Sequence, residues 1–224
     1  GWKEDFMLSY MFPTSAQKQA IEYLNRVTGI FGPKIYVGGH SKGGNLALVA
    51  SMFCKSSARR KIVKVFNFDG PGLRKEQFES KEYQKISSRL VSYVPKFSFV
   101  GMLLRHADNY VVVDSKNIKF LQHDATSWIV KDKNFKRVNI SEFSKRIENG
   151  LMSWLETIDD QKREKFVSNL FDIFKKLKIN DLNDIKKSKI NSIIKIIKET
   201  RNLDKESKEM MLTGFKSFYK EVKE

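Results

Sequence analysis

The sequence has few of the residues that build disulfide or metal frameworks. Its 224 residues include one cysteine and three histidines. The single thiol, Cys54, excludes an intrachain disulfide and fits a reducing compartment, so a cytoplasmic location is expected. Three scattered histidines argue against a zinc site, and no cofactor is expected.

Long apolar runs are also missing. The longest, Leu46–Cys54 and Phe97–Leu104, are far shorter than the about 20 residues that span a bilayer. The first six residues, Gly1 to Phe6, are charged and amphipathic, which is not the pattern of a signal peptide.

Acidic residues are outnumbered, and the net charge is +16. Residues 1–140 hold 23 Lys and Arg against 11 Asp and Glu, whereas residues 141–224 hold 19 against 15. The basic first part suits an anionic substrate or an anionic membrane surface, although a lysine-rich composition that only keeps the surface soluble explains it equally well. Nucleic acid is not favoured, because no RNA-binding, zinc-finger or helix-turn-helix pattern is present.

Alternating strand and helix patterns predict an α/β fold with a mostly parallel sheet, covered on both faces, over residues 1–137. From residue 138 the pattern is helical, which predicts a helical subdomain or arm over residues 138–224. The expected strands are Lys34–Val37, Lys61–Phe68, Leu90–Val94, Tyr110–Val113 and Ser127–Val130. The expected helices are Ala16–Val27, a helix ending near Cys54, Lys75–Ser88, Ser141–Leu155, Asp159–Leu177, Leu182–Ile197 and Lys205–Lys223.

The most informative motif is Gly39-His40-Ser41-Lys42-Gly43-Gly44, a G-x-S-x-G pattern between an expected strand and an expected helix. In this context the pattern is typical of a nucleophile elbow, which exposes a serine hydroxyl at the end of a sheet. Gly39 and Gly43 are expected to let strand and helix approach without a Cβ clash, and Gly44 to add room. The backbone N–H of Lys42 is expected to stabilise an oxyanion. The alternative is a glycine-rich turn whose serine only faces solvent.

A serine nucleophile needs a base, and the base needs an orienting acid. His123 is favoured as the base because it lies on a late loop, after the strand Tyr110–Val113. His106 is the rival, and His40 is interpreted as structural because its side chain should point away from the serine. Asp69 is favoured as the acid because it closes the strand that follows the elbow, where catalytic groups of open α/β sheets gather.

Other interpretations of the acid stay open. Asp69 is also suited to capping a turn, and Asp108, Asp114 and Asp124 are rival acids.

The chain resembles an uncharacterised bacterial family of α/β-hydrolases related to class 3 lipases. The residues that carry the resemblance are Trp2–Phe6, Gly39–Ala47, Phe68–Gly72, Ser98–Leu104 and Gln122–Trp128, so it covers residues 1–137. It implies that Ser41 is the nucleophile and His123 the base of a serine hydrolase.

Two features depart from class 3 lipases. Their acid stands in a D-x-V-P context after a later strand, where this chain has Ser98-Phe99-Val100-Gly101. Only about 33 residues precede the elbow strand, so we expect N-terminal strands and a second oxyanion donor to be missing, as in a fragment.

The expected function is therefore a serine esterase or lipase-like hydrolase acting on a small-molecule or lipid ester through an acyl-enzyme. The alternatives are an inactive hydrolase fold used as a binding module, and a basic protein that binds membrane or nucleic-acid surfaces. An apolar segment is interpreted as core, or else as an acyl pocket; its residues are Phe97, Phe99, Met102, Leu103 and Leu104.

Overall fold

A computed structural model describes residues 6–30, 32, 34–107, 109–152, 157–177 and 198–213. The chain forms two compact units. One comprises Phe12–Glu148 and holds the sheet, and the other combines Gly1–Met11 with Asn149–Glu224. The domain boundary predicted between residues 137 and 138 stays a prediction.

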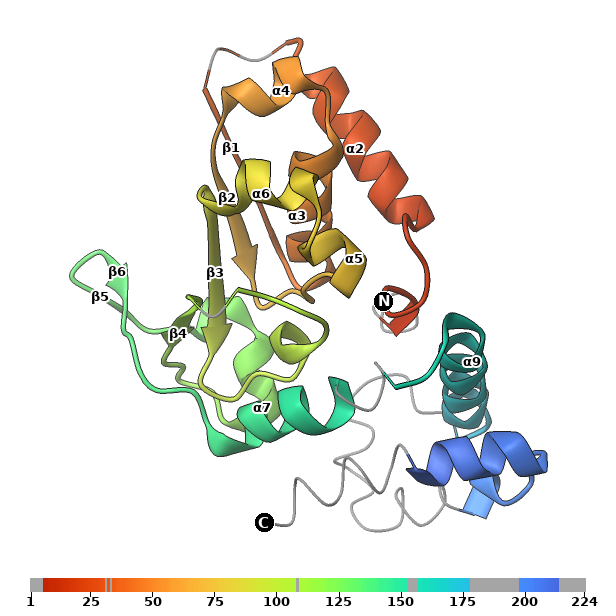
Figure 1. Cartoon of the computed structure of the whole chain (residues 1–224). Helices are drawn as coiled ribbons and strands as arrows, with labels where there is room; N and C mark the ends of the chain where they lie inside the picture. Colours follow the sequence, from red (N-terminus) through yellow and green to blue (C-terminus); the bar gives the residue numbers. More distant parts are fainter. Residues whose placement is uncertain are drawn as a thin grey trace. The chain divides into compact units, whose positions relative to one another are not determined.

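The first unit is built on a four-stranded sheet in the order β1-β2-β3-β4 (Figure 1). All three strand pairs are parallel. The strands are β1 (Ile35–His40), β2 (Ile62–Phe68), β3 (Leu90–Pro95) and β4 (Val111–Val113). The predicted α/β fold with a mostly parallel sheet is confirmed, and four of the expected strands are found within three residues of their predicted bounds.

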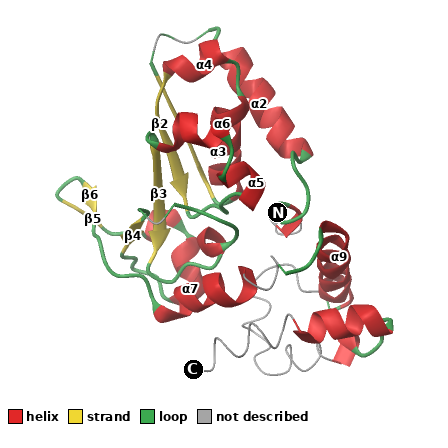
Figure 2. Ribbon diagram, viewed as in Figure 1, coloured by secondary structure: helices red, strands yellow, loops and turns green. Residues whose placement is uncertain are grey.

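Helices pack on one face of this sheet, as Figure 2 shows. They are α2 (Ser15–Val27), α3 (Lys42–Phe53), α4 (Ser56–Lys61), α5 (Lys75–Phe78) and α6 (Lys81–Ser87). Helix α3 is apolar on nearly all sides because it lies between the sheet and α2. Val49, Met52, Val65 and Ile86 are fully buried in the shared core of these elements.

The opposite face of the sheet carries aromatic side chains instead of a second layer of helices, in the part of the chain that the structure describes. Phe66, Phe68 and Tyr93 stack in a row with ring centroids 5.5–6.0 Å apart. Tyr36 extends the row and is 67% exposed. The expectation that helices cover both faces is therefore wrong for the described residues.

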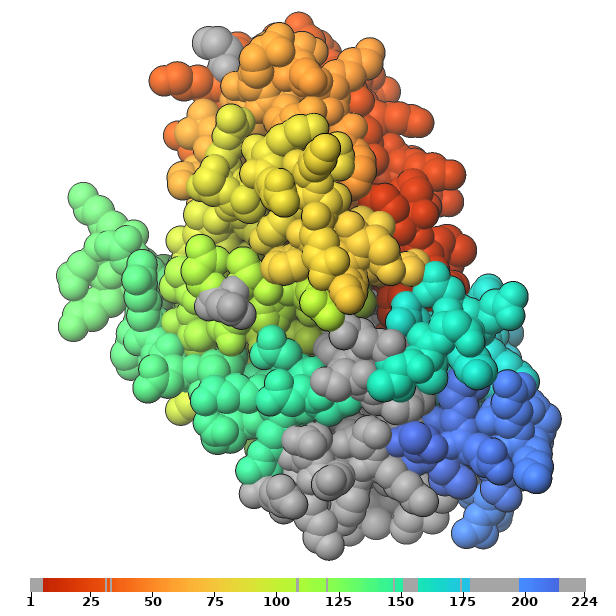
Figure 3. Space-filling view, in the orientation of Figure 1, coloured from red at the N-terminus to blue at the C-terminus, as the bar shows by residue number. Residues whose placement is uncertain are grey.

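The segment that follows β4 is a series of short elements, η2 (Lys119–His123), η3 (Ala125–Ser127), β5 (Val130–Lys131) and β6 (Asn134–Phe135). One more short element, η1 (Val100–Met102), lies between β3 and β4. Strands β5 and β6 form a hairpin that stands out from the surface (Figure 3). The strand expected over Ser127–Val130 is found only in part: Ser127 ends the 3-10 turn η3, Trp128 forms an isolated bridge with Ser115, and Val130 begins β5.

Two other local predictions are wrong. Helix α4, which is absent from the expected helices, buries Ala58, and the Arg59 side chain holds it by donating to the Met52 carbonyl. The helix expected over Lys75–Ser88 is two helices, because Ser80 caps a new one with its side chain.

The described part of the second unit consists mainly of helices. It contains η4 (Glu148–Met152), which follows α7 (Glu142–Ile147), then α9 (Asp160–Lys176) and a helix over residues 205–213. Phe166, Leu170 and Ile173 of α9 are buried. The helix expected over Leu182–Ile197 lies outside the described residues. No helix among the described residues is long and apolar enough to cross a membrane.

Candidate active site

Ser41 occupies a sharp bend between β1 and α3. Its backbone has φ 57° and ψ −132°, a region that residues other than glycine rarely adopt. Two backbone hydrogen bonds hold the bend. The N–H of Ser41 donates to the carbonyl of Phe68 (2.9 Å), and the carbonyl of Ser41 accepts from the N–H of Gly44 (2.8 Å). The predicted strand–turn–helix context of the G-x-S-x-G motif is confirmed.

The three glycines of the motif differ in how much space their surroundings leave for a side chain. A Cβ on Gly39 would overlap the backbone carbonyl of Gly43, and a Cβ on Gly44 would overlap the side chain of Asn67. A Cβ on Gly43 would meet nothing within 4 Å. The expectation that Gly43 must be small is therefore wrong, since only its backbone approaches the strand.

Asp69 directly follows β2, just as Ser41 directly follows the neighbouring strand β1. It also has a positive φ, 49°, and its side chain is buried. Asn67 closes the turn, because its side-chain oxygen accepts from the N–H of Gly70 (2.9 Å) and its amide donates to the Gly70 carbonyl (3.2 Å). A Cβ on Gly70 would overlap the carbonyl of Ser41, so the two bends touch.

The structure brings Asp69 and His123 together across 54 residues of sequence. The Nδ1 of His123 donates to Oδ2 of Asp69 at 2.7 Å. His123 is 31% exposed and Asp69 only 1%, so the carboxylate is buried while the imidazole reaches the surface. This contact gives the imidazole a defined orientation.

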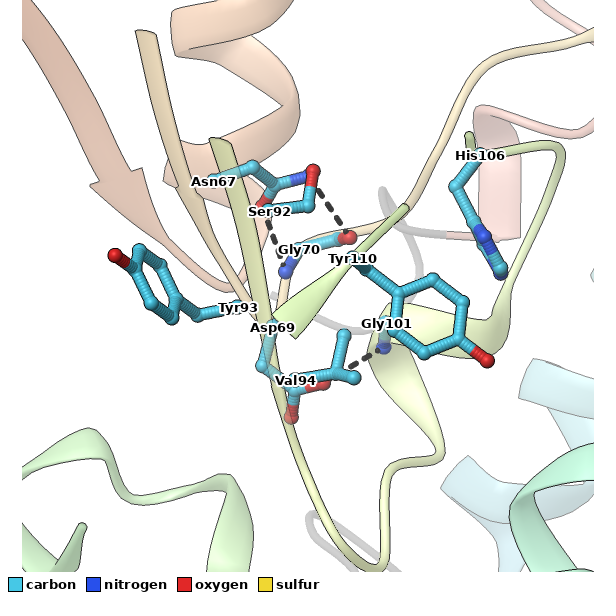
Figure 4. Close-up of a pocket in the computed structure, with 9 residues that line it drawn as sticks. All are labelled: Asn67, Asp69, Gly70, Ser92, Tyr93, Val94, Gly101, His106 and Tyr110. Carbon is cyan, nitrogen blue, oxygen red and sulfur yellow. Dashed lines mark hydrogen bonds between the residues drawn. The ribbon is translucent and has the colours of Figure 1, made fainter. Parts of the chain in front are cut away.

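The other carboxylate oxygen of Asp69 is held by a residue whose role sequence reasoning missed. The fully buried Ser98 donates from Oγ to Oδ1 at 2.5 Å, and the N–H of Gly101 donates to the same oxygen at 3.1 Å. Figure 4 shows the Gly101 contact beside a small cavity. Ser98 thus contacts Asp69 from the place where the resemblance expects an acid, and that position after β3 was the signal available in the sequence.

A buried glutamine fixes the loop that carries His123. The side-chain oxygen of Gln122 accepts from the N–H of Phe97 (2.9 Å), and its amide donates to the carbonyl of Asn117 (3.0 Å). The Gln122 carbonyl accepts from the indole of Trp128 (2.8 Å). Gln122 begins one of the segments that carry the resemblance, but the sequence assigns it no role of its own.

Ser41 and His123 lie on neighbouring elements. His40, the residue before Ser41, contacts the His123 carbonyl through Nε2 at 2.6 Å, and the two imidazole rings are 4.6 Å apart. No hydrogen bond joins the Ser41 hydroxyl to the His123 imidazole among the described residues. The Nε2 of His123 likewise has no hydrogen-bond partner within the described ranges.

His106 lies at the small cavity that Asp69 also lines. It lines the small cavity with Asn67, Ser92 and Tyr110 (Figure 4), and its side chain is 10% exposed. Neither ring nitrogen is hydrogen-bonded within the described part of the chain, although Nε2 is 3.4 Å from the Glu148 carboxylate.

The rival acids have other partners. Asp114 accepts from Lys136 at 2.6 Å, and this bond holds the pKa of Asp114 below its usual value. Asp124 accepts from the hydroxyl and the N–H of Thr126, which likewise lowers its pKa. Asp108 lies outside the described residues.

The remaining site expectations concern donors, pockets and metals. Lys42 is the first residue of α3, so its backbone N–H lies at the helix N-terminus. Met102 and Leu103 are buried, in agreement with a core role. No group of three or more potential metal ligands is found among the residues that the structure describes.

The parallel sheet and the bend at Ser41 define an α/β protein with its polar residues gathered at the carboxyl ends of the strands. Residues 1–172 match the model of the Mbeg1-like family, so the chain belongs to the Mbeg1-like family. Neither a curated protein nor a solved structure matches it.

Proposed function

We propose that this protein is a serine hydrolase of the esterase or lipase type, related to class 3 lipases. The observation that carries the proposal is the 2.7 Å contact between Asp69 and His123, formed beside the strained bend at Ser41. A buried carboxylate that orients a partly exposed imidazole is the arrangement that makes a nearby hydroxyl nucleophilic.

In the proposed reaction the Ser41 oxygen attacks the acyl carbonyl of an ester while Nε2 of His123 takes the hydroxyl proton. Asp69 accepts from Nδ1 of His123, which keeps the other nitrogen available as a base and stabilises the imidazolium that forms. The backbone N–H of Lys42 stabilises the oxyanion at the start of α3.

The tetrahedral intermediate collapses when His123 returns the proton to the leaving alcohol, which leaves an acyl group on Ser41. A water molecule then attacks the acyl-enzyme while His123 accepts its proton, and His123 gives that proton to the Ser41 oxygen as the carboxylic acid leaves.

The missing hydrogen bond between Ser41 and His123 is compatible with this reaction. In proteins without substrate the contact between nucleophile and base is often long and tightens only when substrate binds.

The test is labelling of the purified full chain with a fluorophosphonate probe. The wild type should be labelled, and Ser41→Ala and His123→Gln should not. His106→Gln is the matched control, because it also removes one imidazole of the first unit and should keep the labelling. Equal labelling of Ser41→Ala and wild type would overturn the proposal, as would failure of the folded wild type to react.

A further inference from the structure

His40 has contacts that its place in the motif did not predict. It is the last residue of β1, directly before Ser41, and its side chain lies on the exposed face of the sheet. From there it reaches the loop of His123, where Nε2 lies 2.6 Å from the His123 carbonyl oxygen. The two rings also pack against each other at 39° with centroids 4.6 Å apart.

We propose that His40 is a positioning residue that holds His123 in register with Ser41; this inference rests on the proposed function. A carbonyl oxygen only accepts, so Nε2 of His40 carries a proton and donates it to the hydrogen bond. The tautomer of His40 is therefore fixed by the backbone of the base that it holds.

The geometric consequence follows from two fixed points on one residue. The imidazole of His123 is held by Asp69 at Nδ1, and its backbone is held by His40 at the carbonyl. Together these contacts restrict where Nε2 of His123 points. Because His40 is bonded covalently to Ser41, the second contact ties the base to the nucleophile through a single peptide unit.

Among the described hydrogen bonds of the His123 loop, the one from His40 connects this loop to β1. Gln122 holds the loop to Phe97, on the far side of Asp69's strand, and makes no bond to β1 among the described residues. The contact of His40 is the described hydrogen bond that joins the end of β1 to the His123 loop. Without the His40 contact, Gln122 and Asp69 would still hold the loop, but neither is bonded to β1 in the described part of the chain, so the separation of Ser41 and His123 would be less restricted.

Three substitutions separate the hydrogen bond from the ring contact. His40→Gln keeps an N–H donor near the position of Nε2 and loses the ring, His40→Phe keeps the ring and loses the donor, and His40→Ala loses both. Tyr36→Ala is the matched control, because Tyr36 lies on the same face of β1 and its ring packs on Phe66 instead. Circular dichroism and urea midpoints establish that each variant is folded.

The first readout is the second-order rate constant of fluorophosphonate labelling. His40→Ala and His40→Phe should react about 10- to 100-fold more slowly than wild type, the effect of misplacing a catalytic group by about 1 Å. His40→Gln should recover most of the rate, and Tyr36→Ala should react as wild type does. Wild-type labelling of His40→Ala, or recovery by Phe and not by Gln, would overturn the inference.

The second readout does not depend on hydrolysis. Proton NMR of the histidine-labelled protein should show the Nδ1 proton of His123, protected by Asp69, in wild type and in His40→Gln. The signal should broaden or exchange rapidly in His40→Ala and His40→Phe. If the wild type does not react with the probe, the proposed function fails, and this spectrum still decides the role of His40. An unchanged signal in His40→Ala would refute it.

Discussion

Removing the hydroxyl of Ser98 should lower the free energy of unfolding and slow the proposed reaction. Ser98 is completely buried and donates to the Asp69 carboxylate at 2.5 Å. A hydrogen bond to a charged group contributes about 1.5–3 kcal/mol, and Ser98→Ala leaves Oδ1 with the longer bond from Gly101 alone. We expect the free energy of unfolding at pH 7 to fall by about 2 kcal/mol.

The matched control is Ser51→Ala. Ser51 is also completely buried, but its hydroxyl donates at 2.7 Å to the Ala47 carbonyl within α3, which is uncharged. The substitution removes the same atom from the same degree of burial, and alanine favours the helix. Its cost should stay below about 1 kcal/mol.

Urea unfolding followed by tryptophan fluorescence measures both variants. The labelling rate with a fluorophosphonate should fall by up to about 100-fold in Ser98→Ala, because Asp69 and its imidazole lose their fixed position, and should be unchanged in Ser51→Ala. The reasoning is refuted if Ser98→Ala costs no more stability than Ser51→Ala. It is equally refuted if Ser98→Ala reacts at the wild-type rate.

Three further outcomes are expected. Asp69→Asn should fold but lose about 10⁴-fold in labelling rate, since the amide does not hold the base in the required tautomer; a loss under tenfold contradicts the role of Asp69. In urea unfolding, Gly39→Ala should cost about 1–3 kcal/mol through its overlap with backbone, whereas Gly43→Ala should be neutral or stabilising by up to about 1 kcal/mol, and equal costs would contradict the described bend. Burial raises the pKa of the Cys54 thiol, so Ellman's reagent at pH 8 should react quickly with the unfolded chain and slowly with the native one; rapid native reaction would contradict its buried position.

The sheet and the bend were predictable because their signals are local. A run of β-branched residues, a G-x-S-x-G motif and an apolar helix follow one another within about 20 residues, and each has its own pattern. Helix α4 was missed because its six residues carry no apolar period. It is stabilised by contacts outside itself, including the Arg59 bond to the end of α3.

The candidate site was predictable in part, for a different reason. Asp69 and His123 were selected by their order along the chain relative to the strands, which a parallel sheet converts into proximity. Ser98 and His40 were missed because their contacts, 29 and 83 residues away, depend on how loops return to the sheet edge. Local patterns do not encode that return. The position of His40 next to Ser41 predicts only that its side chain points away from the serine, and it does not predict the contact with the His123 loop.

The register of the sheet explains why Ser41 and Asp69 meet at all. His40 pairs with Phe68 and Phe68 pairs with Tyr93, so both bends begin at the same level of adjacent strands. At each bend the first N–H continues the ladder, from Ser41 to Phe68 and from Asp69 to Tyr93, and then the backbone turns through a positive φ. Parallel neighbours lie about 4.8 Å apart, so equal register alone sets the proposed nucleophile beside the proposed acid. A third group must then bridge them from above the sheet edge, and His123 is the described imidazole that bonds to one bend and contacts the residue preceding the other.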